Sequence, residues 1–381
     1  MKHPFVHLFL FILTLLATTA SGAEWMTGRF FFFLDPKNSL HLQDLWQGLW
    51  FSVPFLGILT AHEFGHYFMA KYHKIKATLP YYIPFWFSAF APNFGTMGAV
   101  IRIIDRIKSR KHYFDIGIAG PLAGFVIALG VLWYGFSHLP PLEFLYTIHP
   151  EYKLHGLNFN DPFYTKQMAN QFILGDNLLF SFFKNHVADP SRLPPAFEMM
   201  HYPFVFAGYL ALFFTALNLI PIGQLDGGHI LYGLIGPKWF SRIAPVLYVG
   251  FAFFAGLGLF TFNGLKNTPW SGNEEWSQLL NLVLYIYFLK VCFSKISDQP
   301  NTDWALSLGV LVLQLIVSYF IPNVEGYASA LLFVFLLGRF LGIYHPEVEI
   351  DEPLNWQRQV LGWLTLLIFV ICFSPRPFIT G

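Results

Sequence analysis

The stretch FLGILTAHEFGHYFMAKY, residues 55–72, is apolar enough for a membrane helix but carries ionisable side chains at its centre. His62, Glu63 and His66 form an HExxH pattern. A four-residue step on a helix of about 3.6 residues per turn places both imidazoles on one face, where they can bind one metal ion. Glu63 lies about a quarter-turn away, so its carboxylate can reach a water molecule on that metal rather than the metal itself.

The same side chains have a simpler interpretation, in which the histidines are hydrogen-bonded between helices and Glu63 is protonated. An ionisable group inside an apolar span costs at least about 2.5 kcal/mol on insertion scales, and such a group marks a functional site by default. Glu63 is the only acid well inside any of the apolar spans named below. The pattern therefore favours a metal site.

The composition predicts an all-α polytopic membrane protein. Of the 381 residues, 55% are hydrophobic and only 12% are charged, against about 25% charged residues in soluble domains. A helix needs about 20 apolar residues to cross a bilayer. Hydropathy predicts about nine transmembrane helices, at residues 4–22, 45–71, 114–137, 202–222, 243–263, 277–293, 304–321, 327–344 and 358–375.

Charge sets the expected orientation and excludes one class of partner. The net charge is +1 and no long basic stripe occurs, which argues against nucleic acid. Lys and Arg are enriched in cytoplasmic loops, and the main cluster consists of Arg102, Arg106, Lys108, Arg110 and Lys111. This side is expected to be cytoplasmic, with a loop at 138–200 facing outward. Cys292 and Cys372 lie in apolar segments and predict no disulfide framework.

The first apolar segment has two interpretations from composition alone. Lys2, an apolar run and the small residues at 20–23 describe a cleaved signal peptide as well as a retained helix. The expected organisation is an N-terminal helix and loop at 1–44, a core at 45–240 that contains the HExxH pattern, and C-terminal transmembrane helices at 241–381.

Residues 77–101, ATLPYYIPFWFSAFAPNFGTMGAVI, are apolar but interrupted by proline and glycine, so a straight spanning helix is not expected. Irregular backbone at membrane depth is tolerated where protein covers it or where it lines a wet cavity. The segment therefore predicts a short re-entrant membrane segment containing β-strands. An amphipathic surface loop is the alternative.

A catalytic zinc site uses three protein ligands and one open position, so the two histidines leave one ligand to be found. Asp226 and His229, in ALNLIPIGQLDGGHI at 216–230, are the candidates. Pro221, Gly223 and the two glycines after Asp226 are expected to break the helix and present Asp226 from non-helical backbone. Asn218 can donate a hydrogen bond to a substrate carbonyl or oxyanion, or it can bond between helices.

Three motifs give the chain a resemblance to a known family. HEFGH at 62–66, FGTMGAV at 94–100 and NLIPIGQLDGG at 218–228 occur in the order typical of the site-2 protease family, peptidase M50. FDIGIAGPLAG at 114–124 looks like the small-residue start of that family's next core helix. The tail at 345–364, HPEVEIDEPLNWQRQVLGWL, is similar to the EGY-like and bacterial members without a PDZ domain.

The resemblance implies an intramembrane zinc metalloprotease. It implies that His62, His66 and Asp226 bind Zn²⁺, that Glu63 is the catalytic base and that Asn218 assists substrate or transition-state binding. It also favours a retained first helix. Gly223 departs from the proline-rich NxxPxPxLD pattern of many relatives.

The expected substrate is a single-span membrane protein, cut in or near its transmembrane segment. Rival hypotheses are a metal-binding transporter and a catalytically idle membrane scaffold. Polar residues along a transport path are scarce in the spans, and a complete Glu63 argues against the scaffold. No Ser- and Arg-rich transit peptide precedes the first apolar run, so a multi-pass location in a bacterial inner membrane is expected, with the active site toward the cytoplasm.

Overall fold

The fold is mostly helical, with two small sheets. The computed structural model describes residues 4–29, 39–86, 93–159, 161, 163–164, 172–267, 273–299 and 301–380. The chain divides into two compact units. The first comprises residues 1–108, 115–218 and 364–381, and the second comprises residues 109–114 and 219–363.

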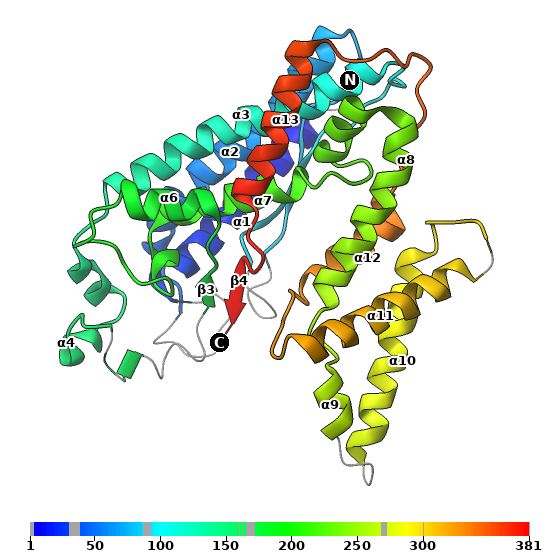
Figure 1. Ribbon diagram of the computed structural model, residues 1–381. Helices are drawn as coiled ribbons and strands as arrows, with labels where there is room; N and C mark the ends of the chain where they lie inside the picture. The colour runs from blue at the N-terminus through cyan, green and yellow to red at the C-terminus, as the bar shows by residue number, and fades with distance from the viewer. Residues whose placement is uncertain are drawn as a thin grey trace. The chain divides into compact units, whose positions relative to one another are not determined.

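The first unit consists of long helices connected by short helices and strands (Figure 1). In chain order the elements up to residue 218 are α1 (Pro4–Thr27), α2 (Asp44–Tyr72), β1 (Tyr81–Pro84), β2 (Thr96–Val100), α3 (Arg110–Ser137), η1 (Leu142–Thr147), α4 (Tyr152–His155), β3 (Phe172–Leu174), α6 (Leu178–His186), η2 (Met199–His201) and α7 (Pro203–Asn218). The strand β4 (Phe378–Thr380) returns from the far end of the chain to pair with β3.

Helices α1 and α2 pack closely because small residues line their crossing. A Cβ on Gly48 would lie 2.8 Å from the backbone nitrogen of Ala23. Thr19 and Ser52 share a hydrogen bond of 2.8 Å between their hydroxyls, which satisfies two polar groups in this buried position. The first apolar segment is therefore a packed part of the unit's core.

The 77–101 segment contains a β-hairpin, as the sequence predicts. Strands β1 and β2 are antiparallel, with Tyr81 opposite Val100, and an isolated bridge joins Ala77 to Ile103. The carbonyl of Asn93, near the start of β2, accepts bonds of 2.7 Å from Ser21 and Trp25 on α1. Residues 87–92, at the turn of the expected re-entrant segment, lie outside the described residues.

Residues 138–202 are here named the lobe, and their described part shares one hydrophobic core with the helices. Phe136 at the end of α3 packs edge-on against Phe180 of α6, with ring centroids 5.3 Å apart. Tyr209 of α7 contacts the same Phe180 ring. The long connection between α3 and α7 is thus a small folded cap rather than an irregular loop.

The lobe and residues 102–108 of the basic cluster lie at opposite ends of α1–α3 within the first unit, since the amide of Thr78, after α2, donates to the carbonyl of Arg102. Trp25, near the C-terminal end of α1, bonds to His201 of the lobe. At the other end, His7 near the start of α1 contacts the carbonyl of Pro80. There too, His73 after α2 pairs with Asp115 of α3 at 2.9 Å.

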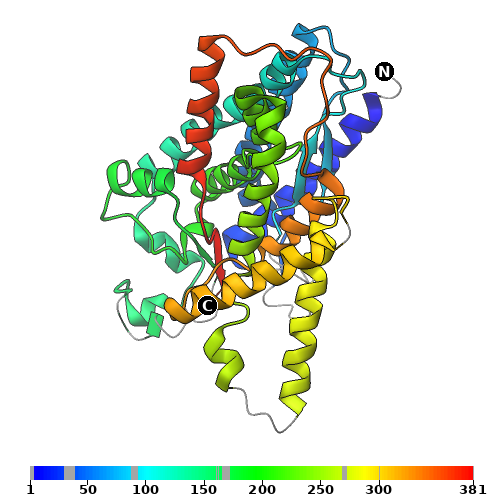
Figure 2. The same ribbon diagram turned by 45° about the vertical axis from the view of Figure 1, so that its right-hand side comes forward.

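The second unit is built from helices (Figure 2). Its elements are α8 (Asp226–Gly256), α9 (Phe262–Asn267), α10 (Asn273–Phe293), α11 (Thr302–Phe320), α12 (Ala330–Leu336), the π-helix η3 (Leu337–Leu341) and the start of α13 (Trp356–Cys372). The fully buried Tyr248 on α8 donates a hydrogen bond of 2.9 Å to the carbonyl of Val334 on α12. Gly236 has a positive φ of 79°, which divides α8 into two helical parts.

The predicted membrane fold is confirmed at a coarser level than nine spans. Five helices of the described residues are long and apolar enough to cross a membrane, namely Pro4–Thr27, Arg110–Ser137, Asp226–Gly256, Trp276–Phe293 and Thr302–Phe320. Three shorter apolar helices are Pro203–Asn218, Ala330–Leu341 and Trp356–Cys372. The expected span at 45–71 is helical throughout but is not among the five.

One local prediction about NLIPIGQLDGG is wrong. Asp226 does not project from non-helical backbone but is the first residue of α8, and Gly227 and Gly228 lie in its first turn. The break falls earlier, at 219–225, where Gly223 has a positive φ of 61°. Both glycines after Asp226 serve close packing instead, since a Cβ on Gly228 would lie 2.7 Å from the carbonyl oxygen of Ile222.

Candidate metal centre

The HExxH residues lie within α2, on one continuous helix, as their spacing predicts. His62, Glu63 and His66 are 6%, 5% and 7% exposed. The Nε2 atoms of the two imidazoles are 3.1 Å apart. Two imidazoles that converge inside a buried helix have the geometry of a shared metal site.

The tautomer of His66 follows from a backbone contact. Its Nδ1 lies 2.7 Å from the carbonyl oxygen of Ile116 on α3. A carbonyl can only accept, so Nδ1 carries the proton and donates it, which leaves the lone pair on Nε2. Metal-binding histidines are oriented in this way by a partner on their other ring nitrogen. The His66 ring is therefore held ready to bind a cation through Nε2.

Small residues on α3 allow the backbone to approach this face of α2. A Cβ on Gly120 would overlap the His66 ring, and a Cβ on Gly124 would lie 3.1 Å from the Cβ of His62. Gly65 of α2 is equally close to α3, because a Cβ there would lie 2.5 Å from the carbonyl oxygen of Ala119. The sequence prediction that FDIGIAGPLAG permits close helix approach is confirmed. These glycines bring the Ile116 carbonyl to His66.

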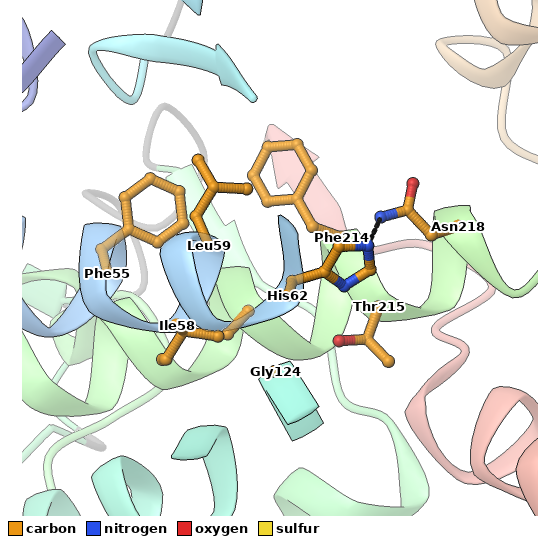
Figure 3. Close-up of a pocket in the computed structure, with 9 residues that line it drawn as sticks. Phe55, Ile58, Leu59, His62, Gly124, Phe214, Thr215 and Asn218 are labelled. Atoms are coloured by element: carbon orange, nitrogen blue, oxygen red, sulfur yellow. Dashed lines mark hydrogen bonds between the residues drawn. The ribbon is translucent and has the colours of Figure 1, made fainter. Parts of the chain in front are cut away.

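Asn218, the last residue of α7, is brought to the same place. Its Nδ2 lies 3.4 Å from Nε2 of His62, as the dashed line in Figure 3 marks. Both residues border a small cavity between α2, α3 and α7, whose lining is otherwise mainly apolar: Phe55, Ile58, Leu59, Gly124, Ala211, Phe214 and Thr215. The contact suits a polar group that assists at a metal centre, and it equally suits the interhelical bond that the sequence leaves open.

The two candidates for a third ligand both lie on α8, in the second unit. Asp226 is its first residue, eight positions after Asn218 along the chain. His229 lies one turn later, and its Nδ1 is 2.8 Å from Nε2 of His345. His229 is thus engaged by another imidazole. The assignment of Asp226 as the third ligand stays a prediction.

Sequence reasoning missed two contributors to the first unit's site. The carbonyl of Ile116 orients His66, but a backbone group leaves no signal in the residue type. The hydroxyl of Tyr82 on β1 forms a hydrogen bond of 2.7 Å with Oγ1 of Thr60, and Thr60 lies two residues before His62. This bond places β1 beside the HExxH turn. The signal in the sequence was a tyrosine within an apolar segment, because a buried tyrosine hydroxyl usually has a hydrogen-bond partner.

Comparison with known proteins agrees with this arrangement. The model of peptidase family M50 matches residues 50–259. The chain is 29% identical over 320 residues to the probable zinc metalloprotease EGY2, chloroplastic, of Oryza sativa subsp. indica. The aligned region covers 79% of this chain and 50% of that protein. It is 27% identical over 267 residues to the probable zinc metalloprotease EGY1, chloroplastic, of Arabidopsis thaliana, with 70% and 41% covered.

The chain thus spans half or less of the length of these relatives. No solved structure matches it. The matched range contains HEFGH, FGTMGAV, the glycine-rich start of α3 and NLIPIGQLDGG, whereas the tail at 345–364 lies outside it. Because the family model covers more than half of the chain, the chain belongs to peptidase family M50.

Proposed function

We propose that this protein is an intramembrane zinc metalloprotease that hydrolyses peptide bonds in or near transmembrane segments of membrane proteins. The observation that carries the proposal is the buried HExxH turn, in which His62 and His66 converge on one point and Glu63 lies beside them. Membership of peptidase family M50 supports the same chemistry. Zinc suits two imidazoles with a carboxylate, a set known from hydrolytic sites.

Asp226 is the proposed third ligand, and the local backbone supports it over His229. A Cβ on Gly227 would overlap the carbonyl of Leu219, so the first turn of α8 lies against the residue that follows Asn218. Asn218 in turn contacts His62. His229 already contacts His345. A carboxylate at the first position of α8 is thus tied by a short folded loop to the residue beside the imidazoles.

The proposed mechanism assigns each side chain a proton or a charge. Zinc bound by His62, His66 and Asp226 would supply Lewis acidity, which acidifies water and polarises a peptide carbonyl. Glu63 accepts a proton from the attacking water and later gives it to the leaving amine. Asn218 donates an amide N–H to the oxygen that becomes negative in the transition state. The apolar lining of the adjacent cavity limits competing water.

The substrate class follows from the position of the hairpin. A transmembrane helix hides its carbonyls in its own hydrogen bonds, so a substrate must unwind before hydrolysis. The β1–β2 hairpin lies beside the HExxH turn through the Tyr82–Thr60 bond. We expect it to hold an unwound segment as an added strand through main-chain hydrogen bonds.

The proposed setting is a multi-pass protein in the lipid bilayer, with about nine spans and the site toward the cytoplasm. The five candidate spans and three shorter apolar helices of the described residues support several crossings. Together with α2 they make nine helices. The basic residues at 102–111 support the orientation. The bacterial inner membrane is the proposed location, whereas the names of the relatives place those proteins in chloroplasts.

The test is cleavage of a model single-span membrane protein by the purified full chain and by Glu63→Gln. The substitution keeps the side-chain shape but removes the base, so we expect the rate to fall by about 10²-fold or more while zinc content is unchanged. Equal amounts of cleavage product from both proteins would refute the proposed protease activity. Metal flux into vesicles that survives Glu63→Gln would instead indicate a transporter.

A further inference from the structure

A second group of converging side chains lies in the lobe, at the opposite end of α1–α3 from the basic cluster. His149 lies between η1 and α4, whereas Glu198 directly precedes η2 and His201 ends it. Nε2 of His149 and Nε2 of His201 are 3.4 Å apart. Oε2 of Glu198 lies 3.5 Å from the former and 3.4 Å from the latter. Three potential metal-binding atoms therefore meet at one point.

Neighbouring groups determine which ring nitrogens carry protons. Nδ1 of His201 lies 2.6 Å from the carbonyl oxygen of Trp25, which can only accept a hydrogen bond. Nδ1 of His149 lies 3.1 Å from a carboxylate oxygen of Glu151. Both Nδ1 atoms are therefore engaged from outside, and both Nε2 atoms face Oε2 of Glu198. A cation at this point would be bound by both Nε2 atoms and by Oε2 together.

Glu198 is buried and is already oriented from its other side. Its side chain has no exposed surface, and its Oε1 accepts a bond of 2.6 Å from the hydroxyl of Tyr152. Its Oε2 has no hydrogen-bond partner within the described part of the chain. A buried oxygen without a partner is costly, and such a group in a folded protein calls for an explanation. Each of the three side chains thus has its outer atom fixed and its inner atom directed at the common point.

A cation at the common point would satisfy the buried Oε2 of Glu198. A proton on this oxygen is the alternative, and the experiment below separates the two.

We propose that His149, Glu198 and His201 form a second binding site for a divalent transition metal of the zinc class, separate from the HExxH centre. Two imidazoles and one carboxylate suit zinc better than calcium or magnesium, which prefer oxygen ligands. The site has a structural role, because His201 also bonds to the Trp25 carbonyl of α1. Metal binding fastens the lobe to α1 and fixes the start of α7, which follows His201 directly.

The experiment removes the first site and measures the second. The full chain carrying His62→Ala and His66→Ala is stripped of metal, and Co²⁺ is then added while its visible absorption is recorded. We expect saturable binding at the lobe site. Adding His149→Ala or Glu198→Gln lowers the Co²⁺ affinity by at least about 100-fold. The matched control is His186→Ala, which removes an exposed lobe histidine and leaves the affinity unchanged.

Glu198→Gln keeps the side-chain shape and the acceptor for Tyr152, and His149 is half-buried, so both variants keep the fold. Thermal unfolding without metal verifies this. Failure of the double variant to bind Co²⁺, or binding that survives both His149→Ala and Glu198→Gln, would overturn the proposal and leave a proton-linked cluster. This outcome is independent of cleavage by the HExxH centre, so either proposal can fail alone.

Discussion

At the scale of single residues, the orientation of His66 is decided from two sides. The carbonyl oxygen of Ile116 lies 2.7 Å from Nδ1 of His66 and keeps the proton on that nitrogen, and Gly120 has no side chain to occupy the space of the ring. The two contributions depend on each other, because a Cβ on Gly120 would keep α3 and its Ile116 carbonyl away from the ring. A metal-binding imidazole is here positioned by backbone rather than by a second carboxylate.

The first prediction compares two glycines of α3. Gly120→Ala places a methyl group into the His66 ring, whereas Gly130→Ala meets nothing within 4 Å. Alanine otherwise favours a helix by about 0.5–1 kcal/mol, so the control is neutral or stabilising. We expect Gly120→Ala to weaken zinc binding by about 10-fold or more and Gly130→Ala to leave it unchanged. Zinc content after dialysis against graded chelator concentrations measures both, and equal retention would show that His66 does not need this space.

Residue spacing predicted the first unit's site well, and distance along the chain explains what it did not predict. HExxH needs only one helical turn, so the convergence of His62 and His66 follows from their four-residue step. His149 and His201 are 52 positions apart, and no periodicity joins them. Only the fold of the lobe brings them together. The Glu198 to His201 spacing was a weak signal, because residues 138–200 form a long polar stretch that was expected to be an outward loop.

At the scale of elements, the first helix is held by its neighbours through small residues. Gly48 of α2 meets the α1 backbone, and the hydroxyls of Thr19 and Ser52 bond across the crossing. The hairpin contacts the same helix through the carbonyl of Asn93, which accepts hydrogen bonds from Ser21 and Trp25. We therefore expect α1 to be retained as part of the working protein rather than removed as a signal.

The second prediction tests this crossing. Gly48→Ala inserts a Cβ into the α1 backbone, whereas Gly57→Ala on the same helix meets open space. Overpacking costs about 1–3 kcal/mol, so Gly48→Ala should lower the midpoint of thermal unfolding in detergent by several degrees. Gly57→Ala should leave it within about 1 °C, as for a surface change. If the two midpoints agree, α1 does not pack on α2 as described.

At one helix boundary, close packing overrides the local preference of glycine for non-helical backbone. Glycines after Asp226 were expected to end a helix, and they instead occupy the first turn of α8. Glycine has a low helix propensity, but here it is required because a Cβ on Gly227 would overlap the Leu219 carbonyl. Close approach to another part of the backbone cannot be distinguished from helix breaking by residue type alone.

At the scale of the whole molecule, the basic cluster predicts which side faces the cytoplasm. Both native cysteines are buried, Cys292 fully and Cys372 at 1% exposure, so background labelling is low. We expect Arg102→Cys to react with a membrane-impermeant maleimide only in inverted vesicles, and Lys153→Cys in the lobe only in right-side-out vesicles. Both positions are exposed. Labelling of both from the same side would contradict the orientation, because the two lie at opposite ends of α1–α3.

One zinc ion is proposed to be held by His62, His66 and Asp226, with Glu63 beside it. A crystal structure of zinc-loaded Glu63→Gln, with diffraction data collected on both sides of the zinc absorption edge, tests this directly. We expect an anomalous peak about 2.0–2.2 Å from Nε2 of both histidines and from a carboxylate oxygen of Asp226. A peak at the histidines with Asp226 turned away, or no peak there at all, would contradict it.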